Sequence, residues 1–305
     1  MARYVSFDHF GGPEVLQLRT APAPLAGPGE VRVRVHTAGL NPVDWKILAG
    51  GEAATRYNAS LPSGNGNDFA GVIDHVGAGV TGFTVGEAVL GGKRMFAQAD
   101  YVVVDPAVLV RKPEKLSFVE AGALDIAGRT AWATVRSLRL TADDTVLVSA
   151  AAGGVGVLAA QLALRTGATV IGTAGPANHD FLLGLGVIPV AYGDGLVERL
   201  RAAAPRYTAA LDNNGAATID AALALGVPGE RINTIAARGH RADAGIQGVG
   251  GQHAEPGDLA ALADLIAGGE VVLPIDSVYP VERVVDAYRH LMAGHLRGKV
   301  TLALE

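Results

Sequence analysis

The chain has 305 residues, of which 49% are hydrophobic and 18% are charged, and its formal net charge at pH 7 is −5. This length can bury two separate cores, and the negative charge argues against a nucleic-acid partner and a polybasic membrane contact. The absence of cysteine excludes disulfides and thiolate metal ligands. No apolar run approaches the roughly 20 residues that span a bilayer, and no signal region precedes the first predicted strand, so we expect a cytoplasmic protein.

Residues 1–110 are predicted to form many short strands. Apolar and polar residues alternate strictly at 31–36 (VRVRVH), which is typical of a half-buried strand. Further strands are predicted at 1–5, 70–77 and 101–104, with glycines marking the turns between them. Because no helical pattern interrupts these strands, we expect a closed or nearly closed barrel.

From residue 117 the pattern changes to alternating helices and strands. Ser117 and Glu120 have the spacing of a capping box at a helix start. The elements predicted next are helix 130–138, strand 145–149, helix 156–166, strand 169–173, helix 178–185, strand 187–190, helix 196–203, strand 209–211, strand 231–236 and helix 258–267. Such alternation indicates an α/β fold with a doubly wound parallel sheet.

The C-terminal segment is predicted to return to the first domain, through residues 271–274, a helix at 281–292 and a strand at 299–304. We therefore assign residues 1–118 and 269–305 to the barrel domain and residues 119–268 to the dinucleotide-binding domain.

A turn of small residues at 150–156 (AAAGGVG) follows the strand at 145–149. Such a turn lets a phosphate approach the backbone, and the next helix offers free N–H groups and the positive end of its dipole. The pattern is the dinucleotide-binding turn between a strand and a helix, with alanine at the first position of Gly-x-Gly-x-x-Gly. The predicted cofactor-binding residues of this turn are Ala151, Gly153, Gly154, Val155 and Gly156. A tight turn that binds no nucleotide is the alternative interpretation.

The end of the next strand bears on which dinucleotide binds. Thr173 is followed by Ala, Gly and Pro, where an NAD site usually has an Asp or Glu that holds the ribose 2′-hydroxyl. The next carboxylate is Asp180, and no Lys or Arg lies between Arg165 and Arg199 to form a basic clamp. Since nothing here repels a 2′-phosphate, we expect NADPH as the cofactor, with Thr173 beside it.

Four motifs occur in order along the chain, at 38–44 (AGLNPVD), 66–80 (GNDFAGV and VGAGV), 151–156 (AAGGVG) and 297–300 (RGKV). With these motifs the chain resembles the zinc-independent medium-chain dehydrogenase/reductases, specifically their NADPH:quinone oxidoreductase branch. The resemblance covers essentially the whole chain. It implies a GroES-like barrel, a Rossmann domain, and a cleft between them that holds the nicotinamide.

Zinc-dependent relatives carry Gly-His-Glu where this chain has Gly66, Asn67 and Asp68, and they have a cysteine near Gly39. Because an Asn amide replaces a neutral imidazole poorly as a zinc ligand, we predict no metal site. Without a Lewis acid, alcohol oxidation lacks the main group that stabilises the alkoxide. Reduction of a quinone or a conjugated C=C bond needs less such stabilisation, because the negative charge is delocalised onto a carbonyl oxygen. The expected activity is hydride transfer from NADPH to a quinone or an α,β-unsaturated carbonyl. An enoyl reductase of secondary metabolism and a non-enzymatic NADPH-binding structural or regulatory protein remain as alternatives.

The resemblance places Asn41 and Asp44 beside the nicotinamide. Asn41 can donate to a substrate carbonyl or to the cofactor carboxamide, and Asp44 can orient its neighbours, while an Asx turn before Pro42 is the alternative. Trp45 stands where many relatives have a tyrosine, and it can stack on a quinone or fill the core. Lys46 can bind a substrate carbonyl or be a solvated loop lysine.

Other family positions concern the cofactor. Thr130 matches a position at a helix start that touches the nicotinamide, with a hydroxyl cap as the alternative. Tyr192 matches a position near the adenosine 2′-phosphate, and Asn213, after a strand, either contacts the ribose or nicotinamide or forms a plain turn. Arg297 and Lys299 match the C-terminal basic motif and are expected to contact the cofactor or the active site. The resemblance also implies a small quinone or enone substrate and a homodimer.

Overall fold

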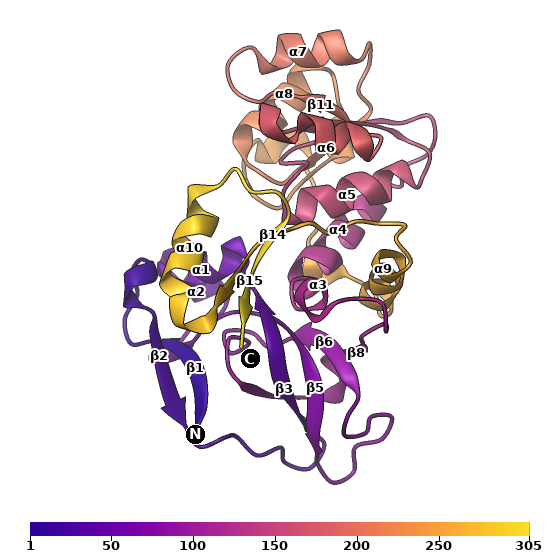
Figure 1. Cartoon of the computed structure of the whole chain (residues 1–305). Helices are drawn as coiled ribbons and strands as arrows, with labels where there is room; N and C mark the ends of the chain where they lie inside the picture. The colour runs from indigo at the N-terminus through magenta and orange to yellow at the C-terminus, as the bar shows by residue number, and fades with distance from the viewer. Residues whose placement is uncertain (305) are drawn as a thin grey trace.

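The computed structural model describes residues 1–304, whose strands form three sheets (Figure 1). Glu305, the last residue of the predicted C-terminal barrel segment, lies outside the described residues. Two of the sheets build the lower part of the molecule in Figure 1, and a five-stranded parallel sheet builds the upper part. Among residues 1–304, no helix has both the length and the hydropathy that crossing a membrane requires.

The lower part is the predicted barrel. Its small sheet has the order β2-β1-β4, and its large sheet has the order β14-β15-β3-β5-β6-β8, with β7 paired to β3. The strands of this part are β1 (Ala2–Phe7), β2 (Gln17–Ala21), β3 (Val31–Gly39), β4 (Ser63–Gly64), β5 (Asp68–Val76), β6 (Ala88–Gly92), β7 (Tyr101–Val104), β8 (Val110–Arg111), β14 (Ile275–Pro280) and β15 (Lys299–Ala303). The alternation that predicted β3 is confirmed, because Val31, Val33 and Val35 are buried between more exposed neighbours.

The expectation of strands without helices in this part is wrong. Two short helices, α1 (Pro42–Leu48) and α2 (Gly51–Arg56), follow β3. Asn41 is the N-cap of α1, and its backbone N–H donates to the carboxylate of Asp44 at 2.7 Å. With Pro42 at the first helical position, this arrangement is a regular helix start. The sequence signals for α1 are its capping residues. A helix of 7 residues is too short to show a helical repeat of apolar residues.

The upper part is the predicted doubly wound sheet, with the order β11-β10-β9-β12-β13 and all pairs parallel. Its strands are β9 (Thr145–Val148), β10 (Thr169–Thr173), β11 (Ile188–Val190), β12 (Ala209–Asp212) and β13 (Ile232–Thr234). The chain moves from β9 toward one edge and returns to continue at β12. Ligands bind at such a switch point, beyond the carboxyl ends of the strands.

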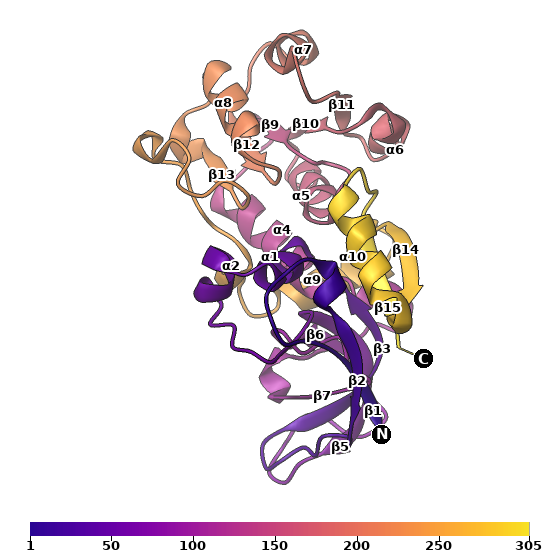
Figure 2. The same ribbon diagram turned by 90° about the vertical axis from the view of Figure 1, so that its left-hand side faces the viewer.

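Helices surround this parallel sheet (Figures 1 and 2). They are α4 (Asp125–Ser137), α5 (Gly154–Leu164), α6 (His179–Gly184), α7 (Leu196–Ala203) and α8 (Ala216–Ala224), while α9 (Asp258–Ala267) lies against α4 and contacts β8 of the barrel. The short helix α3 (Phe118–Ala121) precedes them and confirms the predicted capping box, since Ser117 Oγ accepts the N–H of Glu120 at 3.2 Å.

Two helix predictions in this part need correction. Helix α4 begins at Asp125 instead of residue 130, so Thr130 lies inside the helix and does not cap it. The first turn of α4 consists of residues that also suit a loop, including Gly128, so the sequence pattern indicates a later start. Helix α8 is absent from the predicted elements, although its alanine-rich sequence favours a helix.

The C-terminal segment joins the two parts of the molecule. After α10 (Val284–Ala293), strand β15 pairs antiparallel with β3, which returns the chain to the barrel as predicted. Just before β15, the N–H of Gly298 donates to the carbonyl of Ala152 at 2.7 Å, in the glycine-rich turn after β9. Gly298 has φ +80°, and a Cβ there would lie 1.9 Å from the carbonyl oxygen of Pro274, so only glycine fits. The exact domain boundaries stay a prediction.

Candidate functional site

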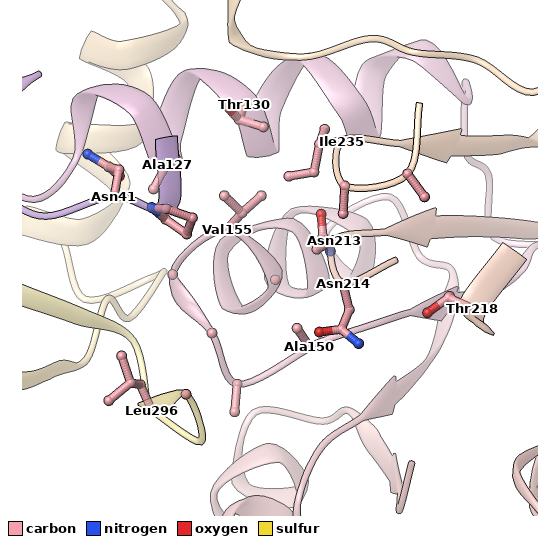
Figure 3. A pocket seen from close by; sticks show the side chains of 18 of the residues that line it. Asn41, Ala127, Thr130, Ala150, Val155, Asn213, Asn214, Thr218, Ile235 and Leu296 are labelled. Carbon is pink, nitrogen blue, oxygen red and sulfur yellow. The ribbon is translucent and has the colours of Figure 1, made fainter. Parts of the chain in front are cut away.

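A cleft of about 2270 Å³ lies between the barrel and the carboxyl ends of the parallel strands. In Figure 3, Asn41 and Leu296 lie on the left, Val155 and Thr130 near the centre, and Asn213 and Asn214 to the right of Val155. The cleft is large enough for a dinucleotide together with a second small molecule, since sites for one small ligand are usually on the order of 300–1,000 Å³.

The glycine-rich turn forms one wall of this cleft. A Cβ on Gly156 would lie 2.1 Å from the carbonyl oxygen of Ala150, so this glycine permits the close contact between β9 and α5. A Cβ on Gly153 would meet no atom closer than 3.2 Å. Gly153, Gly154, Val155 and Gly156 line the cleft, and helix α5 begins at Gly154. The bare turn and the free N–H groups of the first helical turn fit a pyrophosphate.

Ala151 does not line the cleft, although the sequence motif suggested that it does. Its side chain is fully buried, and its N–H donates to the carbonyl of Thr173 at 2.9 Å. The methyl group fills the space beside Gly172 of β10, where an added Cβ would approach it to 2.6 Å. The neighbouring Ala150 and Ala152 face the cleft instead.

The loop after β10 forms the far end of the cleft. Thr173 and Tyr192 line it as predicted, and the Tyr192 hydroxyl lies 2.8 Å from Nδ1 of His295. Arg297 does not line the cleft. Its Nε donates to Oδ1 of Asn178 at 2.9 Å, so this arginine holds the loop from behind. The sequence carries no signal for His295, because its proximity to Tyr192 depends on the fold.

Asn213 also lines the cleft, after β12. Its amide nitrogen donates to the carbonyl of Ser149 at 3.0 Å, which fixes the side chain against the end of β9. Asp212 was missed as a positioning residue. It accepts the N–H of Gly215 at 2.8 Å and the hydroxyl of Thr234 at 2.6 Å, and thereby holds the ends of β12 and β13 together.

The opposite wall carries Asn41 and a buried network behind it. Lys299 Nζ donates to the carbonyl of Leu40 at 2.8 Å and also to Oδ1 of Asn41. Nδ2 of Asn41 is enclosed and makes no hydrogen bond within residues 1–304, so its predicted donation to a ligand requires the amide to become accessible. Asp44 does not line the cleft. Its carboxylate accepts the Asn41 N–H, the Asn67 amide and, at 3.2 Å, the Tyr288 hydroxyl.

Burial controls the charges in this network. It raises the pKa of Asp68 to about 7, although the Lys299 ammonium 3.6 Å away opposes the rise. Burial likewise raises the pKa of Asp44 to about 6 and lowers the pKa of Lys299. The single ammonium group of Lys299 therefore stabilises the charged form of several buried carboxyl groups.

The remaining predicted residues all lie at the cleft. Trp45 is half-buried and Lys46 is exposed, with its Nζ 5.8 Å from the centre of the Trp45 ring. Thr130 lines the cleft from within α4. The structure adds Tyr57 and Arg94 to this wall, from segments that carried no motif.

The residues present do not fit a zinc ion. The chain has no cysteine, and the Asn67 amide donates to Asp44. Within the described part of the chain, no group of three or more His, Asp or Glu side chains is placed to hold a metal.

Comparisons with known proteins match both parts of the chain. A family model described as "Alcohol dehydrogenase GroES-like domain" matches residues 27–114, and one described as "Zinc-binding dehydrogenase" matches residues 185–302. A quinone oxidoreductase of Homo sapiens is 36% identical over 178 residues, which are 57% of this chain and 53% of that protein. The match thus spans about half the length of this curated relative.

Two other relatives match along nearly the whole chain. A 2-methylene-furan-3-one reductase of Solanum lycopersicum is 30% identical over 312 residues, covering 97% of this chain and 78% of that protein. The solved structure of the quinone oxidoreductase from Coxiella burnetii has a TM-score of 0.90 at 30% identity and covers 100% of this chain and 99% of that one.

We predict that Gly153→Val abolishes dinucleotide binding while the fold persists, because the branched side chain would occupy the pyrophosphate position. Binding is measured by fluorescence titration and folding by thermal melting. Gly156→Ala is the contrast, and we expect it to lower the free energy of unfolding by about 1–3 kcal/mol, since its Cβ would meet the Ala150 carbonyl. Normal dinucleotide affinity in Gly153→Val would move the site elsewhere.

We also predict that Lys299→Met destabilises the protein more at pH 8 than at pH 5. The Asp68 pKa is about 7 when folded and 3.8 ordinarily, so its contribution to stability decreases as the pH rises between these values. Without the Lys299 ammonium, the pKa of Asp68 in the folded protein rises further. The free energy of unfolding then continues to decrease up to a higher pH. Urea unfolding should show a loss of about 3 kcal/mol at pH 8 and a smaller one at pH 5. The exposed Lys115→Met is the control, and an equal loss at both pH values would contradict the prediction.

Proposed function

The chain belongs to the medium-chain dehydrogenase/reductase family, in its quinone oxidoreductase branch, and from this premise we propose that it reduces a quinone or an α,β-unsaturated carbonyl with NADPH. One observation carries the proposal. A turn of glycine and other small residues at the start of a helix faces, across one cleft, a wall with an aromatic ring and an exposed lysine, from Trp45 and Lys46. The first wall suits a pyrophosphate, and the second suits a flat acceptor whose oxygen gains negative charge.

The roles of the chain's residues follow from their positions. Gly153 and Gly154 hold the pyrophosphate, and Asn213 and Thr130 flank the space between the turn and the barrel. NADPH, when bound, supplies a hydride from its nicotinamide ring. Lys46, which is exposed in the cleft, offers N–H donors and a proton to the acceptor oxygen, and Trp45 offers an apolar face for stacking.

Support for a conjugated carbonyl as the acceptor comes from the tomato relative, whose name specifies reduction of a 2-methylene-furan-3-one. Support for a quinone comes from the human and Coxiella burnetii relatives. Both acceptors place negative charge on a carbonyl oxygen when a hydride is added, so one wall can serve both. An enoyl reductase of secondary metabolism and a non-enzymatic NADPH-binding protein are less well supported.

We propose NADPH over NADH on the basis of the loop after β10. No carboxylate occurs between Thr173 and Asn178, and Tyr192 and His295 line this end of the cleft. The hydroxyl and imidazole can bind a 2′-phosphate by hydrogen bonds, and Arg297 keeps the loop in place. A homodimer and a cytoplasmic location stay predictions.

Tyr192→Phe should raise the KM for NADPH about tenfold, because a hydrogen bond to a charged group contributes about 1.5–3 kcal/mol. The KM for NADH should change less than about twofold, since NADH lacks the phosphate that accepts this bond. Steady-state kinetics with both dinucleotides measure the effect, and Tyr101→Phe, in the barrel, is the control. Equal changes for the two dinucleotides would show that Tyr192 does not select between them.

The function is tested by following NADPH oxidation with 1,4-benzoquinone, 1,2-naphthoquinone and 2-cyclohexenone, each with and without a chelator. We expect turnover of at least one acceptor and no effect of the chelator, because the site does not fit a metal. Tight NADPH binding without oxidation by any acceptor would favour the non-enzymatic alternative. Activity that depends on stoichiometric zinc would overturn the metal-free site.

A further inference from the structure

A side pocket of about 360 Å³ adjoins the substrate end of the cleft. It shares five lining residues with the cleft, which are Asn67, Arg94, Asp125, Ile126 and Arg129. Its other lining residues are Gly92, Lys93, Ala107 and Val108. The pocket is therefore a branch of the same site, between the end of β6 and the start of α4.

Positive charge dominates this side pocket, although the chain as a whole is negative. Three cations line it, Lys93, Arg94 and Arg129, against the single carboxylate of Asp125. Arg129 is neutralised by Asp125 at 2.8 Å. Within residues 1–304, Lys93 and Arg94 have no carboxylate partner, so the half-buried Lys93 and the exposed Arg94 give the wall of the pocket two uncompensated positive charges.

Arg94 is also held in position. Its guanidinium lies over the ring of Tyr57, with 4.8 Å between the guanidinium carbon and the ring centre. A cation stacked on an aromatic face loses little of its hydrogen-bonding capacity, because its N–H groups lie at the edge of the plane. Arg94 is thus oriented in advance, with donors that can bind a carboxylate.

We propose that the side pocket binds an anionic substituent of the acceptor, so that the substrate class is a conjugated carbonyl compound with a carboxylate group. This inference rests on the proposed function for the reacting carbonyl and on Lys93 and Arg94 for the acid group. Asn67 adds an amide at the junction between the pocket and the cleft. The carboxylate would fix the acceptor at one end while the conjugated carbonyl lies beside Trp45 and Lys46.

The test uses 3-benzoylacrylate and its methyl ester, which differ in charge and share the same flat enone. The chain has no cysteine that could add to the enone. Dissociation constants are measured by calorimetry with NADP⁺ present, so that no reduction occurs. We expect the acid to bind at least tenfold more tightly than the ester. In the double variant Lys93→Gln/Arg94→Gln, the ratio of the ester's dissociation constant to the acid's should fall to about one. This fall should come mainly from weaker binding of the acid.

Arg206→Gln is the matched control, because it removes an exposed positive charge outside the site. It should keep the wild-type ratio, and raised salt should lower that ratio in the wild type. Equal binding of acid and ester by the wild type, or the same ratio in the double variant, would overturn the inference.

Turnover with NADPH separates this inference from the proposed function. If the ester is reduced and the acid is not preferred, the reductase proposal stands and the anion pocket is refuted. If the acid binds preferentially and neither compound is reduced, the anion pocket stands and the reductase proposal loses its support.

Discussion

The buried ammonium of Lys299 is the interaction on which the site depends. It lies on the strand that closes the barrel sheet, one residue after the glycine whose N–H bonds to the dinucleotide turn. It donates to the Leu40 carbonyl and to Asn41 on the opposite wall, and it faces Asp68. The Lys299 side chain thus connects the barrel loop with the sheet behind it, and the backbone of the preceding Gly298 connects the same segment to the Rossmann domain. The relative position of the two walls of the cleft follows from these few bonds.

This arrangement has an energetic cost. Asp44, Asp68 and Lys299 are almost fully buried, and burial moves each pKa toward the uncharged form. Replacing a buried ion pair by apolar residues often does not reduce stability, so such a cluster is weak evidence for a stabilising role. In this protein the buried charged cluster orients polar groups beside the cleft. The apolar core of the parallel sheet, which includes Val146, Leu147 and Val148 of β9, stabilises the fold.

The sequence predicted the local features better than the long-range ones. The fold class, the glycine turn and the capping box at Ser117 depend on residues close together in the chain, and the structure confirms them. Whether a residue of the turn faces the cleft depends on packing against the next strand, and for this reason Ala151 was misplaced. Arg297 was expected at the cleft because of its motif, but its side chain turns to Asn178.

The residues that the sequence did not reveal come from separate segments. Tyr57, Arg94 and His295 have no shared motif, and only the fold brings them to the same cleft as Asn41. Tyr288 likewise bonds to Asp44 across 244 positions of the chain. Single-sequence reasoning uses spacing along a helix or strand, and these contacts have no regular spacing. They follow from the return of β15 to the barrel, which the sequence indicated only in outline.

That return also has a consequence during protein synthesis. Lys299 and Leu40 are 259 positions apart, and β15 pairs with the strand that ends just before Leu40. At about 5–20 residues per second, a ribosome needs on the order of ten seconds or more to add the intervening chain. Throughout this interval residues 37–39 of β3 lack the partner strand that β15 supplies in the finished fold, and an unpaired strand edge can pair with another chain.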